Sequence, residues 1–141
     1  MPCREHASQL WRERKRLAEL NTEVLLVSFE ELPRVRWYLE GADFGFPVLA
    51  DPERAVYHAY GLGRASLVRT WASPKTVLFY GRALLRGKRP PRPVADARQL
   101  GGDFLIDASG RVRFAHTSVE PADRPSIGRL LAAATSAAIN P

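Results

Sequence analysis

The chain has 141 residues, of which 45% are hydrophobic and 26% charged, a composition that suits one globular domain and excludes a disordered or fibrous chain. No apolar run reaches the roughly 18 residues of a membrane span, and charged residues follow Met1 where a signal peptide has its apolar core. The single cysteine excludes an intrachain disulfide framework. We therefore expect a cytoplasmic protein in a reducing compartment.

The formal net charge is +6, from 21 basic and 15 acidic residues. The excess is concentrated between Arg82 and Arg98, where Asp96 is the one acidic residue. No aromatic side chains alternate with these cations, so a stacking platform for single-stranded nucleic acid is not indicated. A solvated basic loop is the favoured interpretation, and nucleic-acid binding is the weakest of the functional alternatives.

In chain order, the first half alternates between helical and extended patterns. Apolar residues three or four apart indicate helices, and short runs rich in β-branched residues indicate strands. Asp51 and Pro52 are typical of an N-cap followed by the first helical position. The predicted elements are helix 4–20, strand 23–29 buried on both faces, helix 30–40, strand 46–50 and helix 51–60.

The second half begins with a mostly helical stretch and a proline-rich loop, and then predicts a β-hairpin and a closing helix. The predicted elements are helix 67–86, loop 87–98, strand 103–107, turn 108–110, strand 111–116 and helix 123–134. This order indicates an α/β fold with a mixed sheet. We expect one domain over residues 1–134 and a frayed C-terminal tail over residues 135–141.

Several motifs occur in a characteristic order along the chain. They are PCREH at 2–6, DPERAVYHAYGL at 51–62, QLGGDFLID at 99–107, GRV at 110–112 and AH at 115–116. This set resembles the peroxiredoxin-like AhpC/TSA family of thioredoxin-like proteins over residues 2–134. The resemblance implies a three-layer α/β/α fold with a mixed sheet.

In that family a strand precedes the first helix, which carries a Cys-x-x-Cys or related motif at its N-terminus. Cys3 corresponds to the second cysteine of that motif, so this chain lacks the usual N-terminal strand and is apparently truncated there. This missing N-terminal strand would lie between strands 23–29 and 103–107. A start codon assigned too far downstream, a truncated remnant, or another segment or chain filling the gap would each account for this. We favour the first.

The resemblance implies redox chemistry at Cys3, because a helix N-terminus favours a reactive thiolate. A peroxide would oxidise Cys3 to a sulfenic acid, which an external thiol would resolve. That thiol would come from a small molecule, a thioredoxin or the second subunit of a homodimer. Known peroxiredoxins hold an arginine against the thiolate from the strand that matches 103–107, which carries none here. The candidate supporting residues are Pro2, Arg4, Gln99, Gly101 and Gly102.

We therefore expect a thiol-dependent redox protein that reduces a peroxide or a disulfide through Cys3. The alternative is a catalytically inactive thioredoxin-fold protein that serves as a binding or scaffold module. We expect no cofactor, and the three histidines and one cysteine lack the spacing of a metal site.

Overall fold

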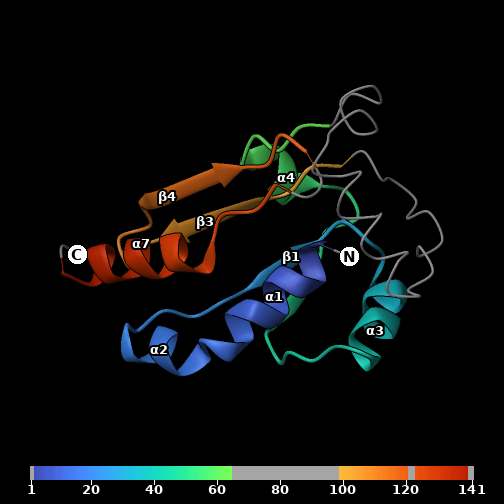
Figure 1. Cartoon of the computed structure of the whole chain (residues 1–141). Helices are drawn as coiled ribbons and strands as arrows, with labels where there is room; N and C mark the ends of the chain where they lie inside the picture. Colours follow the sequence, from blue (N-terminus) through green and yellow to red (C-terminus); the bar gives the residue numbers. More distant parts are fainter. Residues whose placement is uncertain (1, 65–98, 121–122, 140–141) are drawn as a thin grey trace.

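A computed structural model describes residues 2–64, 99–120 and 123–139 of the chain (Figure 1). The predicted helix 67–86, the loop 87–98 and the basic stretch that they share lie outside the described residues. The observed elements are α1 (Pro2–Arg12), α2 (Arg14–Glu19), β1 (Leu26–Ser28), α3 (Leu32–Glu40), β2 (Val48–Ala50), α4 (Ala55–Ala59), β3 (Gly102–Ile106), β4 (Val112–Thr117) and α7 (Ile127–Ile139).

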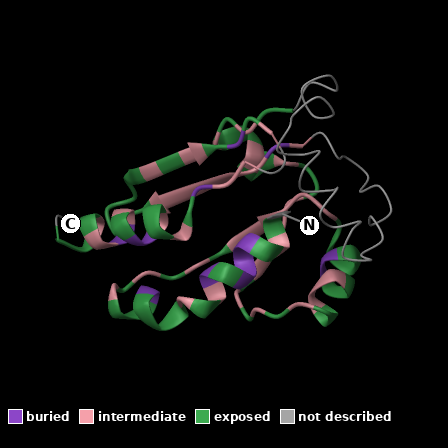
Figure 2. Cartoon of the chain, viewed as in Figure 1, coloured by how far each residue is buried: buried purple, intermediate pink, exposed green. Residues whose placement is uncertain are grey.

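The N-terminal helix is confirmed, but it is divided. The helical pattern predicted over 4–20 forms α1 and α2, which are separated at Glu13. Ala7, Leu10 and Leu17 are buried, as expected for apolar residues that recur on one face. Figure 2 shows buried stretches, coloured purple, along both helices. Helix α3 also agrees with its prediction, with Val35 buried and a proline in the first turn.

The strands pair into two separate two-stranded sheets where a single mixed sheet was predicted. Strands β1 and β2 are parallel, and β3 and β4 are antiparallel. Strands β1 and β3, which were expected to flank a further strand, are not hydrogen-bonded to each other. Strand β1 is shorter and less buried than predicted, and Leu25 beside it is 55% exposed. Among the described strands, β2 alone pairs with β1.

Helix α4 begins later than the sequence predicts. The Asp51 carboxylate accepts hydrogen bonds from the backbone N–H groups of Ala55 and Val56, both at 2.9 Å, so its predicted capping role is confirmed. However, residues 51–54 form a turn, and Arg54, with a left-handed φ of 59°, is the N-cap. The predictions of Asp51 as the N-cap residue and of Pro52 as the first helical residue are therefore wrong in position. The helix starts at Ala55, and the hydrogen bonds of the Asp51 carboxylate span the turn that precedes it.

The hairpin is confirmed, with β3 and β4 joined by a tight turn. The Asp107 carboxylate accepts from the backbone N–H groups of Ser109 and Arg111, both at 2.9 Å. Gly110 takes a positive φ of 82°, which glycine tolerates best. Helix α7 starts at Ile127 rather than 123 and continues to Ile139, so the expected frayed tail is helical as far as that residue.

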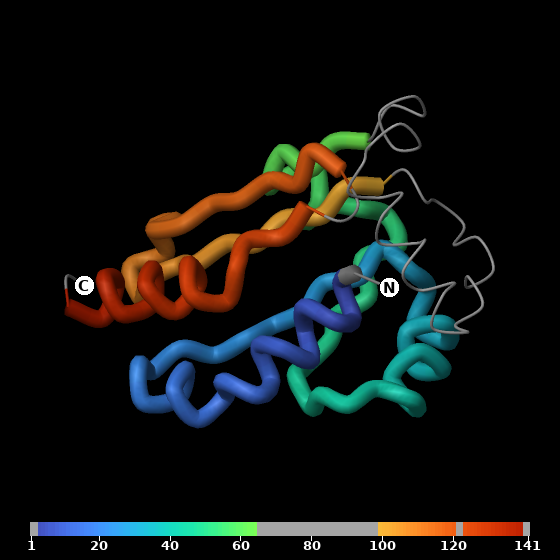
Figure 3. Tube along the Cα trace, in the orientation of Figure 1, coloured from blue at the N-terminus to red at the C-terminus, as the bar shows by residue number. Residues whose placement is uncertain are grey.

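The core joins the two ends of the chain. Leu10 of α1, Leu17 of α2 and Leu131 of α7 form one buried cluster, and Phe46 packs against it. The Trp11 ring meets Phe46 edge to face, with centroids 4.9 Å apart. Figure 3 shows the C-terminal part of the chain lying alongside the N-terminal helices. This packing brings the segment before α7 close to the start of α1. Within the described residues, no helix is long and apolar enough to cross a membrane.

Candidate active site

Cys3 lies in the first turn of α1, with an exposed free thiol. Its sulfur accepts a hydrogen bond from Nη2 of Arg124 at 3.0 Å. Arg124 belongs to the short segment that leads into α7, and its side chain is only 16% exposed. The guanidinium is a strong hydrogen-bond partner for the sulfur, since hydrogen bonds from a charged donor are stronger than neutral ones. The first-turn position also places the sulfur near the positive end of the α1 dipole.

Two further side chains complete a connected group. Nη1 of Arg124 donates to Oδ2 of Asp103 at 3.3 Å. Nε2 of His6 donates to the other carboxylate oxygen of Asp103 at 3.1 Å. The side chains of His6 and Asp103 are 10% and 16% exposed. We call Cys3, His6, Asp103 and Arg124 the Cys3 cluster.

The charges of the Cys3 cluster support one another. Burial raises the pKa of the Asp103 carboxyl, but the hydrogen bonds and charges of His6 and Arg124 outweigh burial and hold this pKa below its usual value. Burial lowers the pKa of Arg124, but the neighbouring Cys3 and Asp103 raise it above its ordinary value. Asp103 is therefore ionised and Arg124 protonated at neutral pH, so a positive charge is held at the sulfur.

The charge on the Cys3 sulfur contributes to the raised pKa values of two tyrosines. Burial, followed by the charge of the Cys3 thiolate, raises the pKa of Tyr38 to about 12. The same two causes raise the pKa of Tyr57 to about 12. The Tyr57 hydroxyl donates to the backbone carbonyl of Val27 at 3.0 Å, which anchors the ring over β1. Both phenols are therefore neutral at physiological pH.

Gly101 is the predicted supporting residue that lies beside the Cys3 cluster. A Cβ atom at this position would lie 2.5 Å from Nη2 and 2.9 Å from Nη1 of Arg124. The guanidinium therefore rests directly on the Gly101 backbone. The group that approaches Gly101 closely is Arg124, which in turn contacts the thiol. Gly102 differs, because a Cβ there would meet the backbone oxygen of His116 at 2.7 Å within the hairpin.

Among the other predicted supporting residues, Arg4 and Gln99 contact partners other than the sulfur. The Arg4 guanidinium stacks over the Tyr38 ring, 5.4 Å from its centroid. The Gln99 amide donates to the backbone carbonyls of Gly63 and Leu100 at 3.2 and 3.1 Å. Pro2 begins α1 directly before the thiol.

An arginine does contact the Cys3 sulfur, but it lies outside the strand at 103–107. The resemblance to peroxiredoxins implied an arginine on the strand at 103–107, whereas Arg124 approaches from the segment before α7. That segment was predicted to be the first turn of the closing helix. One feature of the sequence indicated that Arg124 lies outside the closing helix. Pro125 follows it, and the residue before a proline disfavours the helical conformation. Asp103 was recognised only as the first residue of a strand.

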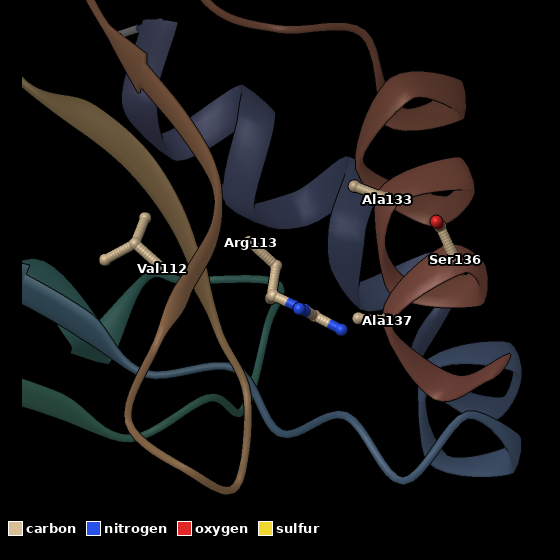
Figure 4. A pocket seen from close by; sticks show the side chains of 5 residues that line it. All are labelled: Val112, Arg113, Ala133, Ser136 and Ala137. Carbon is tan, nitrogen blue, oxygen red and sulfur yellow. The ribbon is translucent and has the colours of Figure 1, made fainter. Parts of the chain in front are cut away.

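Cavities lie elsewhere on the described surface. One of about 450 Å³ lies between β4 and α7, where Figure 4 shows Arg113 reaching toward Ala137. A second, of about 440 Å³, includes Gln99 and His58 in its lining. Neither is lined by a member of the Cys3 cluster, and Cys3 itself is exposed. Over the described ranges, no three His, Cys, Asp or Glu side chains gather in a way that could hold a metal ion.

Comparison with known proteins places the chain in a family. Residues 9–120 match the family described as AhpC/TSA antioxidant enzyme, which is well over half of the chain. The matched range includes Asp103 but neither Cys3 nor Arg124. A search of curated proteins found no match. With the α/β architecture and the parallel and antiparallel strand pairs described above, the chain belongs to the AhpC/TSA antioxidant enzyme family and has its thioredoxin-like fold.

Proposed function

We propose that the protein is a thiol-dependent redox protein in which Cys3 reduces a peroxide or a disulfide. The observation that carries this proposal is the 3.0 Å hydrogen bond from Arg124 to the Cys3 sulfur. It places a half-buried cation, with 16% of its side chain exposed, on a thiol that is itself exposed to solvent. A reactive cysteine needs both features, because the thiolate is the nucleophile and the substrate must reach it. Membership of an antioxidant enzyme family supports the same chemistry.

The peroxide reaction proceeds in three balanced steps. The Cys3 thiolate attacks one peroxide oxygen, the O–O bond breaks, and the departing alkoxide or hydroxide takes up a proton. Cys3 becomes a sulfenic acid, having been oxidised by two electrons. An external thiol then displaces water to form a mixed disulfide. A second external thiolate attacks this disulfide at the external sulfur, which releases an oxidised thiol pair and the Cys3 thiolate.

The external thiol is required because Cys3 is the single cysteine of the chain. We propose a small-molecule thiol or a thioredoxin-like protein as the donor, and a reducing, cytoplasmic setting in which such donors are abundant. Alternatively, a homodimer would supply a second Cys3. The sulfenic acid of one subunit would then condense with the thiol of the other, and a nonreducing gel after peroxide treatment would show the linked dimer.

Peroxide consumption tests the proposal directly. The protein is mixed with hydrogen peroxide and dithiothreitol, and the initial rate is compared for the wild type, Cys3→Ser and Arg124→Gln. We expect Cys3→Ser to reduce the rate to the uncatalysed background. Arg124→Gln should slow it by roughly tenfold or more, the rate equivalent of one hydrogen bond to a charged group. Arg111→Gln, which removes the same charge from the exposed hairpin turn, should leave the rate unchanged.

The contrary outcome has a defined meaning. If Cys3→Ser and the wild type consume peroxide and a disulfide substrate at the same background rate, Cys3 performs no redox chemistry. The inactive binding or scaffold alternative would then replace this proposal.

A further inference from the structure

The Cys3 cluster forms a closed ring of contacts. Cys3 and His6 both belong to α1, three residues apart. From Cys3 the ring passes to Arg124 at 3.0 Å and to Asp103 at 3.3 Å, and it returns to α1 through His6 at 3.1 Å. Three separate parts of the chain therefore meet in one set of hydrogen bonds: the start of α1, the start of β3 and the segment before α7.

The guanidinium of Arg124 is held on two sides. Its two terminal amino groups are divided between the thiol and the Asp103 carboxylate, which fixes the direction of the planar group. The backbone of Gly101 lies against the same two amino groups and leaves no room for a side chain. A long arginine side chain loses considerable rotamer freedom when it is held in one position. The partners that hold it therefore decide how often it contacts the sulfur.

We propose that Asp103, held by His6, is a positioning residue that directs Arg124 onto the Cys3 sulfur. This inference rests on the proposed function and adds a named requirement to it. No hydrogen bond joins Asp103 to Cys3 in the described structure, so its effect on the thiol passes through Arg124. His6 occupies the second carboxylate oxygen and keeps the Asp103 side chain turned toward the guanidinium.

A purely electrostatic role for Asp103 predicts the opposite result. The carboxylate is negative, so it repels a thiolate and partly neutralises Arg124. By charge alone, removing Asp103 would make Cys3 more reactive. By positioning, removing Asp103 makes Cys3 less reactive, because the guanidinium is no longer directed at the sulfur. The sign of the effect therefore separates the two roles.

The experiment is a double-mutant cycle on the full chain. The wild type, Asp103→Ala, Arg124→Gln and the double variant are treated with hydrogen peroxide, and the loss of free thiol is followed over time. Because the chain has one cysteine, the thiol signal reports Cys3 alone. Asp103→Ala should slow oxidation by about tenfold, a typical coupling between residues of one network. In the Arg124→Gln background the same change should cause no slowing.

The outcomes distinguish this inference from the proposed function. A wild-type or faster rate in Asp103→Ala, or an equal slowing in both backgrounds, would overturn the positioning role while leaving Arg124 in place. An Arg124→Gln variant that reacts at the wild-type rate would remove both this inference and the assigned role of Arg124. If the alanine variant folds poorly, the Asp103→Asn variant provides the same test. It keeps the shape and one oxygen acceptor, and should slow oxidation by about threefold, the low end of network couplings.

Gly101 offers an independent test that leaves every charge in the cluster intact. In Gly101→Ala the added methyl group would occupy the space of the guanidinium, so Arg124 must move off the sulfur. We expect oxidation of Cys3 to slow by about tenfold, as for other small displacements of a reacting geometry. Gly128→Ala is the matched control, because a Cβ at that position meets no atom within 4 Å. Equal rates in the two glycine variants would contradict the requirement for a precise Arg124 position.

Discussion

Arg124 and Cys3 are 121 residues apart in the sequence, yet Nη2 of Arg124 lies 3.0 Å from the Cys3 sulfur. The contact exists because α7 packs against the N-terminal helices through Leu131, Leu10 and Leu17. That packing carries the segment before α7 to the start of α1. A thiol at the beginning of the chain thereby acquires a partner from near its end. The chemical character of Cys3 is thus a property of the whole fold.

An Arg124→Lys variant tests whether charge alone is sufficient. Lysine keeps the positive charge, but its single ammonium cannot reach Cys3 and Asp103 with two separate, rigidly spaced donors. We expect iodoacetamide to alkylate Cys3 at neutral pH with a rate between those of the wild type and Arg124→Gln. Arg111→Lys serves as the matched control and should react at the wild-type rate. A wild-type rate in Arg124→Lys would show that the bridging geometry has no role.

Two glycines should respond in opposite directions to alanine. Gly128 lies in α7 with open space around its Cα, so Gly128→Ala should raise the free energy of unfolding by about 0.5–1 kcal/mol. Gly110 has a φ of 82° in the hairpin turn, so Gly110→Ala should lower this free energy by about 1 kcal/mol. Urea unfolding followed by circular dichroism measures both changes. Two shifts of the same sign would contradict the backbone assignment of this pair.

Asp103 should make the stability of the protein sensitive to acid. Its pKa is lowered in the folded state, so its contribution is present above the unfolded value of about 3.9 and is lost as the pH falls through the folded value. Asp103→Asn lacks this titration. The difference in unfolding free energy between wild type and variant should therefore be largest at neutral pH and shrink below about pH 4. Urea unfolding between pH 7 and pH 2 measures it, and parallel curves over that range would refute the prediction.

The titrations of Tyr38 and Tyr57 provide a spectroscopic test of the charge on the Cys3 sulfur. The pKa values of Tyr38 and Tyr57 are raised to about 12, first by burial and then by the Cys3 thiolate. Cys3→Ser removes the second cause, so both values should fall toward the ordinary value of about 10 without reaching it. Phenolate absorbance near 295 nm gives the titration, and Tyr38→Phe and Tyr57→Phe assign the signals. Unchanged titrations in Cys3→Ser would mean that the sulfur does not act on these rings.

Local chemistry explains which elements were predictable. The hairpin follows from Asp107, which accepts two backbone bonds in its turn, and from Gly110, which takes the positive φ. Helix α3 follows from its apolar spacing and the proline in its first turn. The predicted start of α4 was wrong. The Asp51 side chain accepts from the N–H of Ala55, four residues later, and the sequence does not distinguish this from an ordinary N-cap. Local patterns reveal that a cap exists more readily than where the helix begins.

The family, the α/β class and the position of the thiol at the start of a helix could all be predicted from the residues alone. Those features depend on residue order and on interactions between near neighbours. The cation that contacts Cys3, and the groups that hold that cation, became known from the folded structure. Arg124, Asp103 and His6 are brought together by the packing of α7 and β3 against α1, and no local pattern carries that information. Long-range contacts of this kind arise when the core closes, because burial of Leu131 with Leu10 and Leu17 brings distant segments together.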